Sequence, residues 1–416
     1  MTGRVNQIMS EARVAKTYRA GTHRTMPPQE TLLRALRFAP VMGITRIANV
    51  TGLDSIGIPV VMACRPNARS LAVSQGKGLD LSAAKASGLM ESIEVYHAES
   101  ITLPLRHCSY EELRYSHRVV DVRQLPAIST GIFHSNKRML WSEGHDLIND
   151  ESVSVPYELV HTDYTWPQPA GSGCFASSSN GLASGNHLLE AISHGICEVV
   201  ERDSTTLWRF RDQAARDSSR IDLATVDDPA CRRVLEKIEL AGLAVAAWET
   251  TSDIGIASFT CVIFPNKDDP TRRIPPAAGT GSHPARGIAL LRAITEAAQS
   301  RLTQIAGSRD DAGRDRYTDH RYERALDNLR RQVAGAATRS FDDAPDWDSD
   351  TFDGDVDWEL DRLRNAGIQR AIVVDLTKDT FKIPVVRVVI PELEGPHETP
   401  GYMPGRRARE VIARRT

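Results

Sequence analysis

Short apolar runs rich in β-branched residues alternate along the chain with longer segments in which apolar side chains recur every three or four positions. The short runs predict strands, because branched side chains pack well on a pleated surface. The longer segments predict helices. The predicted strands are 58–64, 242–249, 254–264, 371–375 and 383–390, and the longest predicted helices are 81–98, 186–211, 285–305 and 321–334. This alternation favours a mixed α/β fold.

Three of the predicted helices each follow a Gly-containing loop and carry related polar pairs. Sliding these helices on one another aligns Glu91-x-x-Glu94 with Glu198-x-x-Glu201 and with Glu296-x-x-Gln299. The three motifs lie about 100 residues apart, whereas the repeats of solenoid proteins are usually about 20–50 residues long. We therefore expect three corresponding helices that meet around one site.

The second of these helices carries a polar stripe. Asn186, Glu190, His194, Glu198 and Glu201 recur at helical spacing and share one face, while the rest of the helix is mostly apolar. Neighbouring carboxylates on a helix repel each other, and more strongly when they are buried. The pattern predicts either a surface helix that carries Glu for solubility or a site where basic side chains or divalent ions offset the charge. Three such patterns in register favour the site.

Basic residues stand beside these carboxylates. Lys77 lies in a Gly-Lys-Gly sequence, which we expect to be a turn that presents backbone N–H groups and an ammonium to phosphate. Arg202 directly follows Glu201, and Arg301 lies about one turn beyond Glu296. Carboxylates for Mg²⁺ beside arginines for phosphate oxygens are the usual parts of a nucleotide triphosphate site. About six carboxylates exceed the needs of one Mg²⁺, so two or more ions bridged by ATP phosphates fit the charge better.

Composition fits a globular protein and excludes several classes. The 416 residues suffice for two or three lobes, with 41% hydrophobic and 25% charged residues. A net charge of −3 gives no overall basic field for nucleic acid or an anionic membrane. The N-terminus lacks a secretory signal and no run is long enough to span a bilayer, so we expect a soluble, cytoplasmic protein. Six scattered cysteines without a CxxC pair argue against a disulfide framework or a structural zinc site.

One segment near the C-terminus is strongly acidic. It runs from Phe341 to Asp361 and holds ten acidic residues and no basic one, interleaved with Trp347, Phe352 and Trp358. Charge runs of this kind are usually solvated. We expect an acidic loop that its aromatic side chains pack against the protein.

The glutamate helices resemble those of the YcaO family, whose members use ATP to activate a peptide amide. The resemblance covers residues from about 16 to 405. It is strongest at SGLMESIE (87–94) and SNGLASGNHLLEAISHGICEVVERD (179–203), and it extends to TEAAQSR (295–301) and RTMPPQETLLR (24–34). It implies a YcaO-type α/β (α+β) fold of several subdomains, with three Glu-bearing helices around an ATP site. We expect an N-terminal segment at 1–60 that contributes to the nucleotide site, a YcaO domain at 61–405 and a basic tail at 406–416.

The resemblance also implies roles for individual residues. Residues expected to coordinate Mg²⁺ are Glu91, Glu94, Glu190, Glu198, Glu201 and Glu296. Residues expected to contact ATP are Arg24, Thr31, Lys77, Ser87, Asn186, Arg202 and Arg301, and those expected to take part in catalysis are Glu198, Glu201, Arg202 and Arg301. The chain departs from the family at His194, where Gln or Glu is common. This imidazole is expected either to hydrogen-bond in the site or to pack in the helix.

Other segments point to a subfamily. AGSRDD (306–311), DLTKDTFKIPVVRVVIPELEGP (375–396) and PGYMPGRRA (400–408) resemble stand-alone YcaO proteins that pair with TfuA proteins and install backbone thioamides. Azoline-forming members usually come with a leader-peptide-binding domain and often end in a Pro-x-Pro-x-Pro tail. We expect this chain to lack that domain, and its last residues are GRRAREVIARRT rather than such a tail. The resemblance thus implies a TfuA-like partner, a ribosomally made peptide or protein as substrate, sulfide as nucleophile and a homodimer.

Alternatives remain open at this stage. The same ATP chemistry would serve an azoline cyclodehydratase or an amidine-forming enzyme, because the nucleophile cannot be read from these residues. A nucleotide-binding scaffold without catalysis is a third possibility, which so many mutually repelling carboxylates disfavour. Cys174 is expected to be either a small buried hydrophobe or a thiol near the substrate channel.

Overall fold

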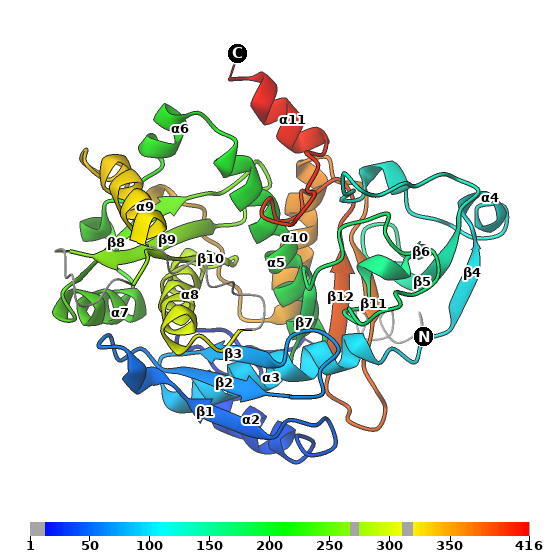
Figure 1. Ribbon diagram of the computed structural model, residues 1–416, viewed down its shortest axis with the longest axis horizontal. Helices are drawn as coiled ribbons and strands as arrows, with labels where there is room; N and C mark the ends of the chain where they lie inside the picture. Colours follow the sequence, from blue (N-terminus) through cyan, green and yellow to red (C-terminus); the bar gives the residue numbers. More distant parts are fainter. Residues whose placement is uncertain (1–12, 267–273, 310–318, 416) are drawn as a thin grey trace.

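The computed structural model describes residues 13–266, 274–309 and 319–415, so parts of the expected 1–60, 306–311 and 406–416 segments (residues 1–12, 310, 311 and 416) lie outside the described residues. The named strands form three antiparallel sheets around a central helix (Figure 1). The first sheet contains β1 (Arg46–Asn49), β2 (Val60–Cys64) and β3 (Val73–Lys77). The second contains β10 (Ala277–Ser282), β9 (Ser258–Pro265) and β8 (Leu243–Glu249).

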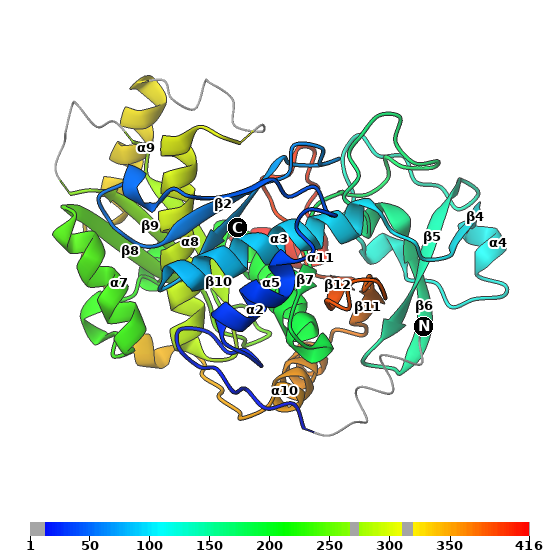
Figure 2. The same cartoon turned by 90° about the horizontal axis from the view of Figure 1, so that it is seen from below.

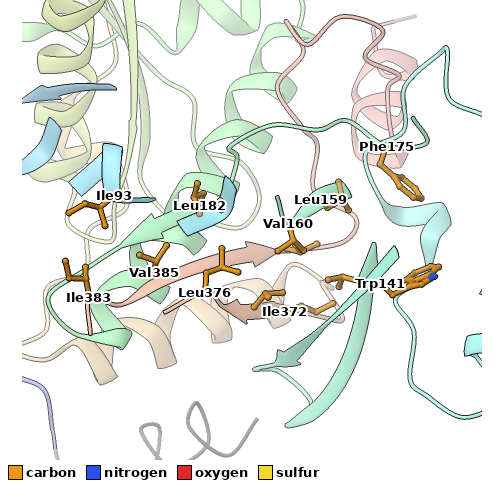
Figure 3. Packing of buried hydrophobic residues seen from close by; sticks show 14 of the residues in the cluster. Ile93, Trp141, Leu159, Val160, Phe175, Leu182, Ile372, Leu376, Ile383 and Val385 are labelled. Atoms are coloured by element: carbon orange, nitrogen blue, oxygen red, sulfur yellow. The ribbon is translucent and has the colours of Figure 1, made fainter. Parts of the chain in front are cut away.

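The third sheet is the largest and brings together distant parts of the chain. Its order is β4 (Leu105–Ser109), β5 (Arg138–Asp146), β11 (Ile372–Asp375), β12 (Val385–Val389) and β7 (Leu182–Ser184), and β6 (Glu151–Pro156) pairs with β5. Figure 3 shows its buried face, where Leu182 and Val385 lie beside Ile93 and the packing continues to Trp141. This core joins the C-terminal strands to the N-terminal half of the protein.

One strand of each sheet packs against one long helix near the centre of the molecule. The strand–helix units are β3 with α3 (Leu81–Glu99), β7 with α5 (Leu188–Arg209) and β10 with α8 (Arg286–Ala306). In Figure 1, α5 stands upright, α3 runs beneath it and α8 lies to its left, and Figure 2 shows α3 crossing the other two. Glycines allow close packing, since a Cβ on Gly76 would lie 2.1 Å from the backbone of Gly88, and one on Gly279 would lie 2.2 Å from that of Ala297.

The remaining helices cover these sheets or close their ends. They include α2 (Pro28–Leu36), α4 (Tyr110–Leu113), α6 (Gln213–Ser218), α7 (Pro229–Leu240), α9 (Asp319–Gln332), α10 (Phe352–Asn365) and α11 (Arg406–Ala413). Short 3₁₀ turns occupy 51–53, 122–124, 157–159, 223–225 and 341–343. Within the described ranges, no helix is long and apolar enough to cross a bilayer.

The predicted strands and helices are confirmed, with ends shifted by a few residues, but two local expectations are wrong. The Gly-Lys-Gly sequence at 76–78 is not a turn: Gly76 and Lys77 pair with β2, and the N–H of Gly78 donates to Pro59 O. The acidic segment is a loop only until Thr351, because 352–361 belong to α10. Within the expected basic tail at 406–416, residues 406–413 form α11, and its buried Arg407 is paired with Asp203.

Candidate functional site

The three central helices enclose a cavity of about 1050 Å³. Its wall contains all six glutamates proposed from the sequence, together with most of the proposed nucleotide contacts. These lining residues are Glu91, Glu94, Glu190, Glu198, Glu201, Glu296, Arg24, Thr31, Lys77, Ser87, Asn186 and Arg202. The predicted meeting of three glutamate helices around one site therefore occurs in the structure.

One end of the cavity is formed by the start of α5 and the N-terminal chain. Glu190 is buried and its Oε2 accepts hydrogen bonds from the N–H and the hydroxyl of Thr25, both at 3.0 Å. Arg24 lies 3.6 Å from the other carboxylate oxygen of Glu190. The hydroxyl of Thr31, in α2, donates to Asn186 Oδ1 at 3.0 Å. This end thus offers a guanidinium, hydroxyls and an amide to a ligand.

The middle of the cavity holds three carboxyl groups with raised pKa values. Burial raises the pKa of Glu94 to about 8 and that of Glu91 to about 7. Burial also raises the pKa of Glu198 to about 7, against the opposing effect of Arg202. The N–H and hydroxyl of Ser184 donate to Glu94 Oε1 at 2.9 and 2.6 Å. These three carboxyl groups therefore tend to stay protonated near neutral pH unless a bound cation displaces their protons.

Another part of the cavity wall combines carboxylates with cations. Lys77 Nζ lies 2.8 Å from Glu296 Oε2. Although burial alone would raise it, Lys77 and Arg202 lower the pKa of Glu296 to about 2. The Thr280 hydroxyl donates to Glu201 Oε1 at 2.7 Å, and Arg202 Nη1 lies 3.5 Å from the same oxygen. Basic and acidic groups thus alternate here, as they must where phosphates and metal ions share one site.

The donor set fits hard divalent cations. Mg²⁺ takes oxygen ligands and usually keeps only one or two carboxylates per ion, with phosphate oxygens and waters completing its shell. Within the described ranges, no three acidic, His or Cys side chains already converge as a ligand cluster. Instead the carboxylates bind hydroxyls, Lys77 or protons around a wide cavity. Such dispersed carboxylates suit ions that are held between the protein and a polyphosphate.

The structure does not bring Arg301 to the cavity. Its Nε donates to Asp54 Oδ2 at 2.8 Å, and both side chains are almost fully buried. The physical reason is helical geometry: five residues after Glu296 correspond to a rotation of about 140° around the axis of α8. The contact with phosphate that the sequence implied for Arg301 is therefore not supported by this geometry.

The sequence alone did not identify several other residues that line the cavity. Arg292 precedes Glu296 by four residues on α8, so helical spacing could have identified it, and its Nη1 donates to Ser282 O at 3.0 Å. Arg309 also lines the cavity and lowers the pKa of Glu91, against the larger effect of burial. Gln75 lies on β3 and accepts from the Thr303 hydroxyl at 2.6 Å. Arg309 follows helix α8, and Gln75 lies in a strand. Helical periodicity therefore gives no signal at either position.

His194 and Cys174 have different positions. His194 lines the cavity, and burial lowers its imidazole pKa well below the usual value, so the ring is neutral. Cys174 is not part of the cavity wall: it is buried, and Lys137 Nζ lies 3.0 Å from its sulfur. This position fits the interpretation of Cys174 as a small buried side chain.

Comparisons with known proteins agree with this arrangement. Residues 75–394 match the family model described as YcaO cyclodehydratase, ATP- and Mg²⁺-binding. A Rhizobium leguminosarum bv. trifolii protein, described as uncharacterized and in the tfuA 3′ region, is 36% identical over 375 residues, 89% of this chain and 88% of its own length. An uncharacterized protein of Methanothermobacter thermautotrophicus is 36% identical over 397 residues, covering 92% of this chain and 98% of its own.

Solved structures show the same fold. The YcaO protein of Methanopyrus kandleri, bound with AMPPCP and Mg²⁺, superposes with a TM-score of 0.73 at 24% identity, over 94% of this chain and 98% of that one. A heterocyclase in complex with substrate and cofactor gives a TM-score of 0.76 at 24% identity over 93% of this chain, which spans 54% of the heterocyclase. The chain therefore belongs to the YcaO family, for which ATP and Mg²⁺ are the cofactors.

Proposed function

We propose that this protein activates a backbone amide of a ribosomally made peptide or protein by transferring the γ-phosphoryl group of ATP to the amide oxygen, and that it installs a thioamide. The observation that carries the ATP chemistry is the ring of six carboxylates from α3, α5 and α8, with Lys77 and Arg202 among them. Support for the thioamide comes from the relative in the tfuA 3′ region, which matches over 89% of this chain.

The proposed reaction balances with sulfide as the nucleophile. Hydrosulfide adds to the carbonyl carbon, and the resulting oxyanion attacks the γ-phosphorus as ADP leaves. The S–H bond and the C–O bond of this intermediate then break, so that C=S forms and the original amide oxygen and the thiol proton leave as hydrogen phosphate. An adjacent Cys, Ser or Thr side chain in place of sulfide would give an azoline, as the family description and the heterocyclase fold allow.

Residues in different parts of the cavity would have different roles in this reaction. Mg²⁺ would neutralise phosphate charge and hold the phosphoryl group in line. Arg24, Thr31 and Asn186 would contact the nucleotide at one end of the cavity, with Glu190 holding Arg24 and Thr25 in place. Arg202 and Lys77, which lie beside Glu201 and Glu296, would stabilise the charge that develops on the transferred group.

Partners and assembly are part of the same proposal. A TfuA-like protein would supply sulfide or help to engage the peptide, so the isolated chain should turn over ATP slowly. The functional unit would be a homodimer acting in the cytoplasm. Full thioamidation by the purified chain at low sulfide, without any partner, would contradict the need for that partner.

Mass spectrometry of the peptide product tests the reaction type. A thioamide adds about 16 Da and an azoline removes about 18 Da, and both release ADP and phosphate if the amide oxygen accepts the phosphoryl group. With ¹⁸O in the substrate amide, we expect the label in phosphate and a heavier peptide. A lighter peptide would indicate that the product is an azoline and not a thioamide. Label retained in the peptide would refute activation of the amide oxygen. ATP binding without any turnover in the presence of partner, sulfide and peptide would favour the scaffold alternative.

A further inference from the structure

An N-terminal strap, residues 13–25, runs across the molecule without a helix or a named strand of its own. It lies beside the acidic segment that leads into α10, as Figure 2 shows for the dark blue chain next to α10. The backbone N–H of Val14 donates to Asp353 Oδ2 at 2.7 Å, and Phe352 N–H donates to Val14 O at 2.9 Å. Lys16 N–H donates to Asp350 O at 2.9 Å. We call residues 348–355 the acidic clamp.

The central contact between the strap and the clamp is a buried ion pair. Lys16 Nζ lies 2.6 Å from Asp355 Oδ2, and both side chains have 0% exposure. The hydroxyl of Ser349 donates to the other oxygen of Asp355 at 2.8 Å. Removing one partner of such a pair leaves an uncompensated buried charge, whereas replacing both by apolar side chains of similar size is often neutral or stabilising. This pair therefore adds a buried contact to the backbone hydrogen bonds that hold the strap against the clamp.

The other end of the strap reaches the cavity. Tyr18 and Arg24 pair through backbone hydrogen bonds of 3.0 and 2.9 Å, which tie the Lys16 end to the cavity end. The tip of the intervening turn is Gly21, whose φ is 72°. A Cβ there would lie 2.4 Å from Leu79 Cδ1, so the turn is packed closely against the protein. Arg24 then meets Glu190, as does Thr25.

We infer that the acidic clamp positions the strap and thereby sets the affinity for Mg²⁺-nucleotide, with Lys16 and Asp355 as positioning residues for Arg24. This inference rests on the placement of ATP in the cavity. It gives the acidic segment a role that the sequence did not indicate. Neither Lys16 nor Asp355 lines the cavity, so any effect on nucleotide affinity is indirect, and the strap is the segment that joins Lys16 to Arg24.

Three variants measured with Mg²⁺-AMPPCP test the inference: Lys16→Met, Asp355→Leu and the double variant. Each single change should weaken nucleotide binding about 10–100-fold, the range seen when residues that hold ligand-binding groups are lost. The double variant should recover most of the affinity, because no unpaired buried charge remains. Arg364→Ala, on α10, is the matched control, since its pair with Asp361 is exposed and involves neither the strap nor the clamp, so its loss should matter little. Unchanged affinity in the folded single variants, or no recovery in the double variant, would overturn the inference.

A measurement on the unaltered protein covers the case in which single variants do not fold. If strap and nucleotide are coupled, nucleotide must stabilise the docked strap in return, by a factor of about 5–150 for typical coupling. Saturating Mg²⁺-AMPPCP should therefore slow tryptic cleavage after Arg19, while cleavage after the exposed Arg123 should not change. Equal cleavage rates after Arg19 with and without nucleotide would refute the inference. Failure of the unaltered protein to bind Mg²⁺-AMPPCP would instead refute the proposed site.

Discussion

Replacing Glu94 by Gln should stabilise the protein without metal and weaken its binding of Mg²⁺-nucleotide. Glu94 lies on α3, and burial raises its pKa from 4.5 to about 8. Glutamine has the same shape, and its carbonyl oxygen can still accept the hydrogen bonds from Ser184. The substitution therefore removes the charge with little change in packing.

The magnitude follows from proton linkage. Because the folded pKa lies above the unfolded one, the contribution of Glu94 to stability is fully present below pH 4.5 and is lost as the pH rises to about 8. Each pH unit between these values costs about 1.4 kcal/mol, which would amount to about 3 kcal/mol at pH 7. The side chain is partly accessible to solvent in the cavity, and this screening lowers the expected difference to about 1–2 kcal/mol. Glutamine does not titrate, so the advantage of the variant should grow across this range.

Urea unfolding in EDTA, at half-unit steps from pH 4.5 to 8.5, measures this difference. Glu99→Gln is a matched control on the same helix. Glu99 Oε2 lies 2.6 Å from Arg65 Nη1, and both residues are buried. That variant should lose stability over the whole range, because it leaves Arg65 without its counter-charge. A stability difference for Glu94→Gln that stays flat with pH, or tighter binding of Mg²⁺-AMPPCP by this variant, would refute the reasoning.

Three further predictions concern the same cavity. Glu198→Gln should abolish turnover while the chain stays folded, and nucleotide binding to the unaltered protein should disappear in excess EDTA; calorimetric binding that persists in EDTA would contradict the metal assignment. Lys77→Met should raise the pKa of Glu296 from about 2 and weaken nucleotide binding about tenfold or more, since it removes a cation from the phosphate end; an unchanged affinity would place the phosphates elsewhere. Arg301→Met should lower the melting temperature by leaving Asp54 unpaired, yet preserve nucleotide affinity; a selective loss of affinity would restore Arg301 to the site.

The amino-acid sequence determined the helices that carry the site. Glutamates at helical spacing in otherwise apolar segments predict both the helix and its polar face, because 3.6 residues per turn fix which side chains share a side. The same rule explains why Arg292 belongs with Glu296 and why Arg301 does not, although only the structure showed Asp54 as its partner. The Gly-Lys-Gly sequence wrongly predicted a turn, because glycine is found where a helix packs closely on a strand as well as in turns.

Tertiary structure alone decided which distant groups meet. Lys16 and Asp355 are far apart in the sequence, and neither carries a local pattern that indicates a buried ion pair. The acidic segment looked like a solvated loop, because composition records charge but not the counter-charge that another part of the chain brings to it. Periodicity is a property of neighbouring residues, and it predicts the faces of a helix. Compensation of buried charge and the pKa values that follow from it depend on contacts across sheets and helices, and these exist only in the folded chain.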